Sequence, residues 1–184
     1  MSPRKRRPAM PGVENKTDTQ SMIRVDHAGE YGAVRIYAGQ LAVLGKRKSE
    51  TADAIRKMAE QEQEHLAAFD KLINERRVRP TALEPVWRVA GFALGAATAL
   101  LGEKAAMACT AAVEEVIDEH YAQQVERLDG DLPLKQAVEK FRADEVAHKN
   151  EALERGAEEA PGYKLLSETI KAGCRLAIKL SERI

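Results

Sequence analysis

Two copies of a short pattern of glutamate and histidine constrain the fold of this chain more than any other feature. Glu62 is followed three residues later by His65, and Glu145 is followed three residues later by His148. Because residues i and i+3 share one face of an α-helix, each pair can offer a carboxylate and an imidazole to the same ion. The repeat therefore predicts two helices that each carry a Glu-x-x-His metal-binding pair.

A further glutamate precedes each pair at nearly the same spacing. Glu30 lies 32 residues before Glu62, and Glu114 lies 31 residues before Glu145. The turns between them are centred near residues 47 and 131, so the two arms of each helical hairpin have almost equal lengths. Each helical residue rises about 1.5 Å, so equal arms bring the two acidic positions to the same height. Two such hairpins supply four carboxylates and two imidazoles, the ligand set of a ferritin-like carboxylate-bridged dimetal site.

Hydrophobic periodicity assigns the first half of the chain to two helices. Apolar residues recur at helical spacing from about Asp18 to Leu44. After a turn at 45–48, Ser49 is suited to cap a second helix, which the Arg-Pro pair at 79–80 would end. The segment 81–85 is expected to be a linker. These elements form the first predicted hairpin.

The second half is expected to be helical as well. Helical spacing continues from Val86 to about Leu128, with a bend or break near its glycines, and a turn follows at 129–131. A helix is expected from Pro133 to about Glu159, and a last amphipathic helix after 160–162. The predicted fold class is all-α: a ferritin-like four-helix bundle of two helical hairpins, plus an apolar segment and a C-terminal amphipathic helix.

Composition supports one helical domain and excludes several classes of protein. Only 4% of the 184 residues are aromatic and 44% are hydrophobic, which favours a bundle over a β-sandwich. Lys+Arg and Asp+Glu are equal at 29 each, which argues against nucleic acid as a partner. Residues 1–17 are expected to be a disordered basic tail without a secretory signal, and 18–184 a ferritin-like di-iron helical domain. The apolar run 89–101 is too short to span a bilayer.

Several other polar residues have both a functional and a structural interpretation. Tyr37 and Tyr121 lie two helical turns beyond the first glutamate of each hairpin, where they could donate hydrogen bonds, relay electrons or simply line the core. Asp26 and Asp118 lie one turn from the same glutamates and could orient a ligand histidine or face solvent. The two histidines outside the repeat, at 27 and 120, are expected to be polar neighbours and not ligands.

The motifs also resemble a known family. The block Asp-His-Ala-Gly-Glu-Tyr-Gly-Ala at 26–33, with Glu62-x-x-His65, Ala-Val-Glu-Glu at 112–115 and Glu145-x-x-His148, resembles the demethoxyubiquinone hydroxylases of ubiquinone biosynthesis. The resemblance runs from about Asp18 to the C-terminus. It implies a di-iron monooxygenase that hydroxylates the ring of 5-demethoxyubiquinol with O₂ and with electrons from NADH or a reductase.

The resemblance also implies roles for particular residues and partners. Tyr121 matches a tyrosine near the metals, and the apolar segment 86–101 is suited to reach a polyprenylated quinone. The expected location is peripheral, on the cytoplasmic face of a bacterial inner membrane or, for a trimmed chain, the matrix face of the mitochondrial one. A lipid-presenting partner protein and a homo-oligomer are compatible with this interpretation. The implied ligands of two iron ions are Glu30, Glu62, His65, Glu114, Glu145 and His148.

Two alternatives use the same residues differently. A ferritin-like ferroxidase or peroxidase would use the same six ligands without a quinone, and quinone-dependent turnover distinguishes it. A non-enzymatic membrane-binding helical scaffold would bind no stoichiometric iron, and its glutamates and histidines would be incidental members of Glu-rich helices. Manganese is a further alternative to iron, because glutamate and histidine ligands do not separate the two sharply.

Overall fold

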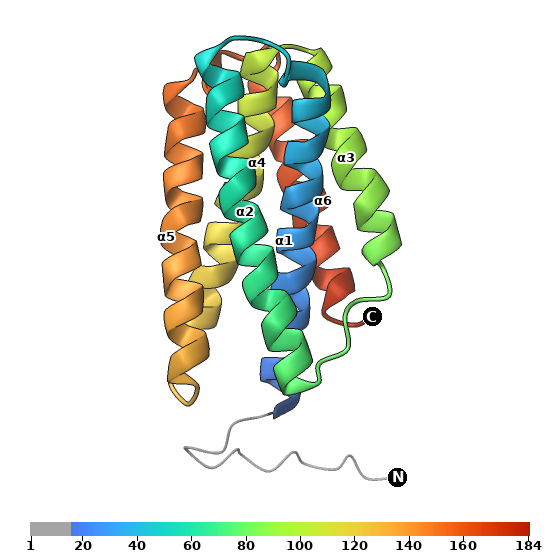
Figure 1. The fold of residues 1–184 in the computed structure, drawn as a ribbon, viewed down its shortest axis with the longest axis vertical. Coiled ribbons are helices and arrows are strands. Elements are labelled where there is room, and N and C mark those ends of the chain that lie inside the picture. The colour runs from blue at the N-terminus through green and yellow to red at the C-terminus, as the bar shows by residue number, and fades with distance from the viewer. Residues whose placement is uncertain (1–15) are drawn as a thin grey trace.

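Six α-helices make up the part of the chain that the structure describes (Figure 1). The computed structural model describes residues 16–184, and side chains from residue 18 onward. No strand occurs in this range, so the all-α prediction is confirmed. The expected tail lies outside the described residues, apart from its last two residues, which begin the first helix. The elements are α1 (Lys16–Leu44), α2 (Glu50–Arg76), α3 (Glu84–Leu100), α4 (Glu103–Val125), α5 (Leu132–Glu154), the 3-10 turn η1 (Ala157–Glu159) and α6 (Tyr163–Ser181).

The bundle consists of two antiparallel hairpins, α1 with α2 and α4 with α5, which lie together as predicted (Figure 1). The two remaining long helices are added on the outside: α3 packs along α1, and α6 packs along α4. Because α1 and α4 are covered on their outer sides, side chains on several of their faces can be buried. This arrangement places α1 and α4 between the bundle interior and the two added helices.

Local capping explains where the hairpin helices begin and end. The Ser49 hydroxyl accepts a hydrogen bond from the backbone N–H three residues later at 3.2 Å, which confirms it as the cap of α2. The Asp131 carboxylate caps α5 in the same way, also at 3.2 Å. The prediction that this helix continues to about residue 159 is wrong. It ends at Glu154, because Gly156 adopts a left-handed conformation with φ of 81° and the chain turns into η1.

Glycines allow α3 to lie unusually close to α1. A methyl group on Gly95 would collide with the carbonyl oxygen of Ile36, and one on Gly39 would collide with the carbonyl oxygen of Phe92. The far side of α3 carries exposed apolar residues, including Val89 at 64% and Leu100 at 74%. Among residues 16–184, none of the helices combines enough length and hydropathy to cross a bilayer.

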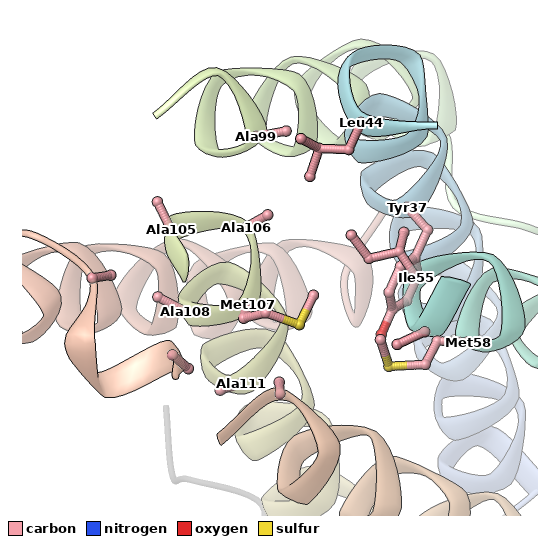
Figure 2. Close-up of a cluster of buried hydrophobic side chains, with 14 of the residues drawn as sticks. Tyr37, Leu44, Ile55, Met58, Ala99, Ala105, Ala106, Met107, Ala108 and Ala111 are labelled. Atoms are coloured by element: carbon pink, nitrogen blue, oxygen red, sulfur yellow. The ribbon is translucent and has the colours of Figure 1, made fainter. Parts of the chain in front are cut away.

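The hydrophobic core at one end of the bundle is made largely of alanine and methionine (Figure 2). Ala106, Met107 and Ala108 on α4 are fully buried, and their small or flexible side chains let the neighbouring helices approach closely. Tyr37 extends from α1 into this cluster, with its hydroxyl 3.7 Å from the sulfur of Met58 (Figure 2). The same hydroxyl donates a hydrogen bond to the buried carboxylate of Glu114 in the middle of the bundle.

Candidate metal centre

The structure brings together all six side chains that the sequence singles out as candidate ligands. They come from all four bundle helices: Glu30 on α1, the first Glu-x-x-His pair on α2, Glu114 on α4 and the second pair on α5. Each is at most 3% exposed, so this concentration of ionisable groups lies inside the bundle. The equal arms of the two hairpins therefore do place these positions at one height. The six residues are Glu30, Glu62, His65, Glu114, Glu145 and His148.

Within the described residues, these side chains form two overlapping groups of four. One group contains Glu30 and His65, the other contains Glu114 and His148, and both contain Glu62 and Glu145. In each group the potential ligand atoms all lie within 4.8 Å of one another. The two shared glutamates thus lie between two adjacent positions that could each hold a cation.

The Glu-x-x-His pairs are more closely associated across the hairpins than within their own helices. Glu62 lies 3.0 Å from Nδ1 of His148 but 4.0 Å from Nδ1 of His65, three residues along its own helix. Glu145 lies 3.2 Å from Nδ1 of His65 and 3.6 Å from Nδ1 of His148. Each shared glutamate therefore lies within 4.0 Å of both imidazoles, between the two donor groups.

The outward nitrogen of each histidine has its own partner on the opposite hairpin. His65 Nε2 lies 3.1 Å from Asp144, and His148 Nε2 lies 3.2 Å from Gln61. These contacts fix the ring orientation and direct Nδ1 into the cluster. Gln61 and Asp144 each come directly before the glutamate of a Glu-x-x-His pair, a signal that would have identified them.

Neither Asp26 nor Asp118 contacts a histidine of the cluster, so the structure does not support the first of the two interpretations that the sequence left open for them. Asp118 instead accepts a hydrogen bond from Arg142 at 2.7 Å and pairs with Lys149. Asp26 is buried, but its carboxylate faces Gln124 and a histidine outside the cluster. The spacing along one helix identified residues near the glutamates, whereas the partners of the histidines come from the helix opposite.

Both tyrosines donate hydrogen bonds to glutamates of the cluster. The Tyr37 hydroxyl donates to Oε1 of Glu114 at 2.6 Å, and the Tyr121 hydroxyl donates to Oε1 of Glu30. Each tyrosine is at most 2% exposed. Of the interpretations left open by the sequence, hydrogen-bond donation at the cluster is therefore confirmed for both, although both also pack in the core.

Most of the inward-facing atoms of the cluster have no hydrogen-bond partner. Burial, followed by the neighbouring carboxylates, raises the pKa of Glu62 and of Glu114 well above the usual range, and burial raises the pKa of Glu145 to about 7. Burial alone would lower the pKa of His65, but the carboxylates of Glu145 and Glu30 beside its Nδ1 raise it to about 10. The atoms without a partner are Oε2 of Glu30, both carboxylate oxygens of Glu62 and Glu145, Oε2 of Glu114, and Nδ1 of His65 and His148.

This donor set fits divalent cations. Unpaired buried carboxylates cost several kcal/mol each, and cations placed among them would remove that penalty and use the lone pairs that lack partners. Carboxylate and imidazole ligands suit iron, manganese and zinc. The two histidines present the nitrogen that lacks a partner, which is the atom that a metal requires.

An apolar cavity of about 410 Å³ lies on the outer side of α1 and α4, between them and the two added helices. Its lining includes Gly29 and Val113, which directly precede the glutamates that α1 and α4 contribute to the cluster. Trp87 on α3 and Ser181 on α6 also line it, and the indole N–H of Trp87 donates to the Ser181 hydroxyl at 3.2 Å. The cluster and the cavity therefore share α1 and α4 as a common wall.

A bundle in which two helices contribute one glutamate each and two contribute Glu-x-x-His defines the ferritin-like class of carboxylate-bridged dimetal proteins. A family model described as "Ubiquinone biosynthesis protein COQ7" matches residues 17–181. The chain belongs to this COQ7 family of ubiquinone biosynthesis proteins.

Curated relatives from bacteria and from mitochondria are similar over most of the chain. The 3-demethoxyubiquinol 3-hydroxylase of Rhodospirillum rubrum is 59% identical over 163 residues, which cover 88% of this chain and 76% of the relative. The mitochondrial NADPH-dependent 3-demethoxyubiquinone 3-hydroxylase of Homo sapiens is 54% identical over 168 residues, covering 89% and 76%. The mitochondrial 5-demethoxyubiquinone hydroxylase of Saccharomyces cerevisiae is 40% identical over 195 residues, covering 95% and 84%.

Proposed function

We propose that this chain hydroxylates the ring of a demethoxyubiquinol with O₂ at a dimetal centre, in the biosynthesis of ubiquinone. The observation that carries the proposal is the pair of overlapping donor groups, which share Glu62 and Glu145 and adjoin an apolar cavity. The names of the relatives describe the same reaction for those proteins. A ferroxidase or peroxidase would have no need for an apolar cavity of this size beside the centre.

Two iron ions are the cofactor that we propose for the cluster. Glu30 and His65 would hold one ion and Glu114 and His148 the other, while Glu62 and Glu145 belong to both donor groups and would contribute to both. When bound, iron supplies the one-electron chemistry that lets O₂ react with an organic ring. The protein buries the centre and so excludes bulk water from it.

Tyr121 and Tyr37 act on the glutamates that do not bridge. The Tyr121 hydroxyl holds Oε1 of Glu30, which leaves Oε2 directed at the centre. Tyr37 does the same for Glu114. Because each hydroxyl occupies one carboxylate oxygen, each of these glutamates is expected to offer a single oxygen as a ligand. We therefore assign Tyr121 a role at the centre: it holds Glu30 in the orientation that a metal ligand needs.

The apolar cavity is the site that we propose for the quinol. Its walls are almost entirely aliphatic or glycine, including Ile36, Leu94 and Ile170, which suits a planar ring with an isoprenoid tail. The glycines at 29, 32 and 173 leave open space where a side chain would otherwise project into the cavity. A ring bound there would lie against the outer faces of α1 and α4, whose inner faces carry Glu30 and Glu114.

We further propose that the chain binds a membrane surface through α3 and α6. Exposed apolar side chains on these helices, such as Val89, Leu100 and Leu165, lie on the elements that also line the cavity. A polyprenylated quinol resides in the bilayer, so this face would bring the cavity to its substrate. Binding of the isolated chain to vesicles would show that no lipid-presenting protein is required for this contact.

Reduced nicotinamide nucleotide is the electron source that we propose. The resemblance drawn from the sequence implies NADH, whereas the names of several mitochondrial relatives specify NADPH. Both nucleotides belong in the assay, each with and without the quinol.

The test is hydroxylation of a short-chain demethoxyubiquinol by iron-loaded protein, followed by mass spectrometry with ¹⁸O₂. Incorporation of one ¹⁸O atom into the ring supports the proposal. A matched variant, Glu62→Gln, keeps the size of the side chain and should abolish turnover, whereas the exposed neighbour variant Glu64→Gln should not change it. O₂ consumption by iron-loaded protein without any ring hydroxylation would support a ferroxidase and overturn the proposal.

A further inference from the structure

A second cavity, of about 380 Å³, lies at the end of the bundle where α1 begins and α6 ends. In contrast to the first cavity, its lining is mostly polar, and it includes Asp18, His120, Gln124, Arg127 and Arg183. The side chain of His120 is 18% exposed, so it connects this polar cavity with the protein interior. The proposed reaction assigns no role to this cavity.

A buried carboxylate lies directly behind His120. Asp26 is 2% exposed, and its Oδ1 accepts a hydrogen bond from the Gln124 amide at 2.6 Å. Nε2 of His120 lies 3.3 Å from the same oxygen. The other oxygen, Oδ2, is buried and has no hydrogen-bond partner. Asp26 therefore faces His120 with one oxygen and keeps the second oxygen free.

The position of His120 suits it to gain and lose a proton on one nitrogen. Nε2 lies 2.8 Å from the Gln124 amide, a donor, and 3.3 Å from the Asp26 carboxylate, an acceptor. Without a proton, Nε2 can accept a hydrogen bond from the amide. With a proton, it can donate to the carboxylate. Nε2 therefore has a partner in each state, the amide N–H when it lacks a proton and the carboxylate when it carries one.

Asp26, the inner group of this chain, lies one helical turn from a glutamate of the candidate metal centre. Asp26 precedes Glu30 by one helical turn, and residues four apart on a helix have Cβ atoms about 5–6 Å apart. A single water can bridge such a separation. The neighbour of His120 on α4, Tyr121, donates a hydrogen bond to the same glutamate.

The proposed hydroxylation needs protons in a place that bulk water does not reach. Its balance is R–H + O₂ + 2 e⁻ + 2 H⁺ → R–OH + H₂O, in which a ring C–H bond is replaced by C–O and the second oxygen atom leaves as water. The electrons come from the nicotinamide nucleotide. The protons must cross a wall of residues that are at most a few per cent exposed.

We propose that His120 and Asp26 form a proton relay from the polar cavity to the dimetal centre. This inference rests on the proposed function. His120 takes a proton from water in the cavity and passes it from Nε2 to Oδ1 of Asp26. Asp26 then releases a proton from Oδ2 toward the Glu30 side of the centre. Gln124 holds both groups in place throughout.

The electrostatic surroundings favour a proton on Asp26. Burial raises the pKa of its carboxyl, and Glu30 adds to this, although hydrogen bonding and charge from His120 oppose it. The charged or titratable groups around the relay are Glu30 and Asp18 on α1, Tyr121 and Arg127 at the α4 side, and Glu182 and Arg183 beyond α6.

The test compares Asp26→Asn and His120→Gln with the wild type, after iron content and unfolding free energy have been measured for each. Both variants keep hydrogen-bonding capacity but cannot relay a proton. The expected result is normal iron content and unchanged KM for the quinol, with kcat lowered about 10²-fold. In single turnovers of chemically reduced protein, less hydroxylated product should form for each O₂ consumed. The solvent deuterium isotope effect on kcat should rise, and formate should partly restore the activity of Asp26→Asn.

A second measurement does not depend on turnover. In metal-free wild type, an infrared pH titration should detect a carboxyl band that titrates above the usual range of an aspartate and that Asp26→Asn lacks. His120→Gln should slow its exchange in D₂O. Asp118→Asn is the control, because Asp118 lies on the same helix as His120 but pairs with Arg142 and Lys149.

The relay would be overturned if both iron-loaded variants kept the kcat, the product yield and the isotope effect of the wild type. A loss of activity that follows a loss of iron would also overturn it, since Asp26 would then only support the structure. Failure of the proposed function itself would look different, because the wild type would then produce no hydroxylated quinol.

Discussion

The Tyr37 hydroxyl donates a hydrogen bond to Glu114 at 2.6 Å and so joins α1 of one hairpin to α4 of the other inside the bundle. Tyr121 makes the reciprocal bond, from α4 to Glu30 on α1. Each tyrosine follows the glutamate of its own helix by seven residues but orients the glutamate of the opposite helix. The two bonds therefore fix the relative height of the hairpins and the orientation of two candidate ligands.

Replacement of Tyr37 by phenylalanine should destabilise the protein, because it leaves Oε1 of Glu114 buried without its donor. The expected cost is about 1–3 kcal/mol in the free energy of unfolding, measured with urea. The control is Tyr31→Phe, at a half-buried position on the same helix, which should change it by less than about 0.5 kcal/mol. Equal stability of the two variants would show that the bond contributes nothing.

The stability of the metal-free protein should fall as the pH rises from 6.5 to 9. A carboxyl with a raised pKa stabilises the fold below its unfolded pKa and loses this contribution as the pH rises to its folded pKa. For Glu145 the folded pKa is about 7, so its contribution covers the lower end of this range. The pKa of His65 is raised from its ordinary value of 6.5 to about 10, so His65 acts in the same direction across the whole range. The lowered pKa of His148, caused by burial, has its effect below this range.

Thermal or urea unfolding across this pH range measures the effect, which should amount to at least about 2 kcal/mol. The double variant Glu62→Gln, Glu145→Gln removes two of the buried acids and should show a flatter pH dependence. Added Fe(II) or Co(II) should abolish the decline, because metal ions bind the deprotonated carboxylates. A stability that increases from pH 6.5 to 9 without metal would contradict this account of the cluster.

Loss of the Asp144 carboxylate should weaken metal binding, although Asp144 is not itself one of the proposed metal ligands. Asp144→Ala removes the partner of His65 Nε2, so the ring is no longer held with Nδ1 inward, and affinity should fall about 10–100-fold. Co(II) titration followed by absorbance measures this. Asp70→Ala provides the control, because Asp70 bonds in the same manner to His27, which is outside the cluster, and its loss should leave affinity unchanged.

Filling the apolar cavity should impair substrate binding while leaving the metal centre intact. Gly173 on α6 lines the cavity, and a side chain there would meet open space. Gly173→Leu should raise KM for a demethoxyubiquinol about tenfold, and Gly173→Ala by a smaller factor. Iron content should stay normal, and stability should increase by up to about 1 kcal/mol because glycine is a poor helix former. An unchanged KM in the leucine variant would place the quinol elsewhere.

The sequence was sufficient to predict the helical class and the convergence of the six candidate ligands. This succeeded because helical rise is fixed, so the distance from Glu30 to Glu62 and from Glu114 to Glu145 determines their relative heights once the turns are located. Gly91 and Gly95 recur at the four-residue spacing typical of close helix contacts, and both lie where α3 approaches α1.

Features that depend on how the two hairpins pack could not be predicted in the same way. The partners of His65 and His148 are Asp144 and Gln61, each from the other hairpin, whereas spacing along one helix pointed to Asp26. The end of α5 was missed because a left-handed glycine terminated it before the apolar pattern ended. The cavity arises from packing of α3 and α6 and has no signature in any single helix.

The most direct test of the central claim is metal analysis of the purified protein beside the double variant Glu62→Ala, Glu145→Ala, which lacks both bridging carboxylates. We predict about two iron ions per wild-type chain, acquired during expression or on addition of Fe(II), and almost none in the variant. Wild-type protein that is folded, contains no metal and does not bind added Fe(II) would contradict the assignment of this cluster as a dimetal centre.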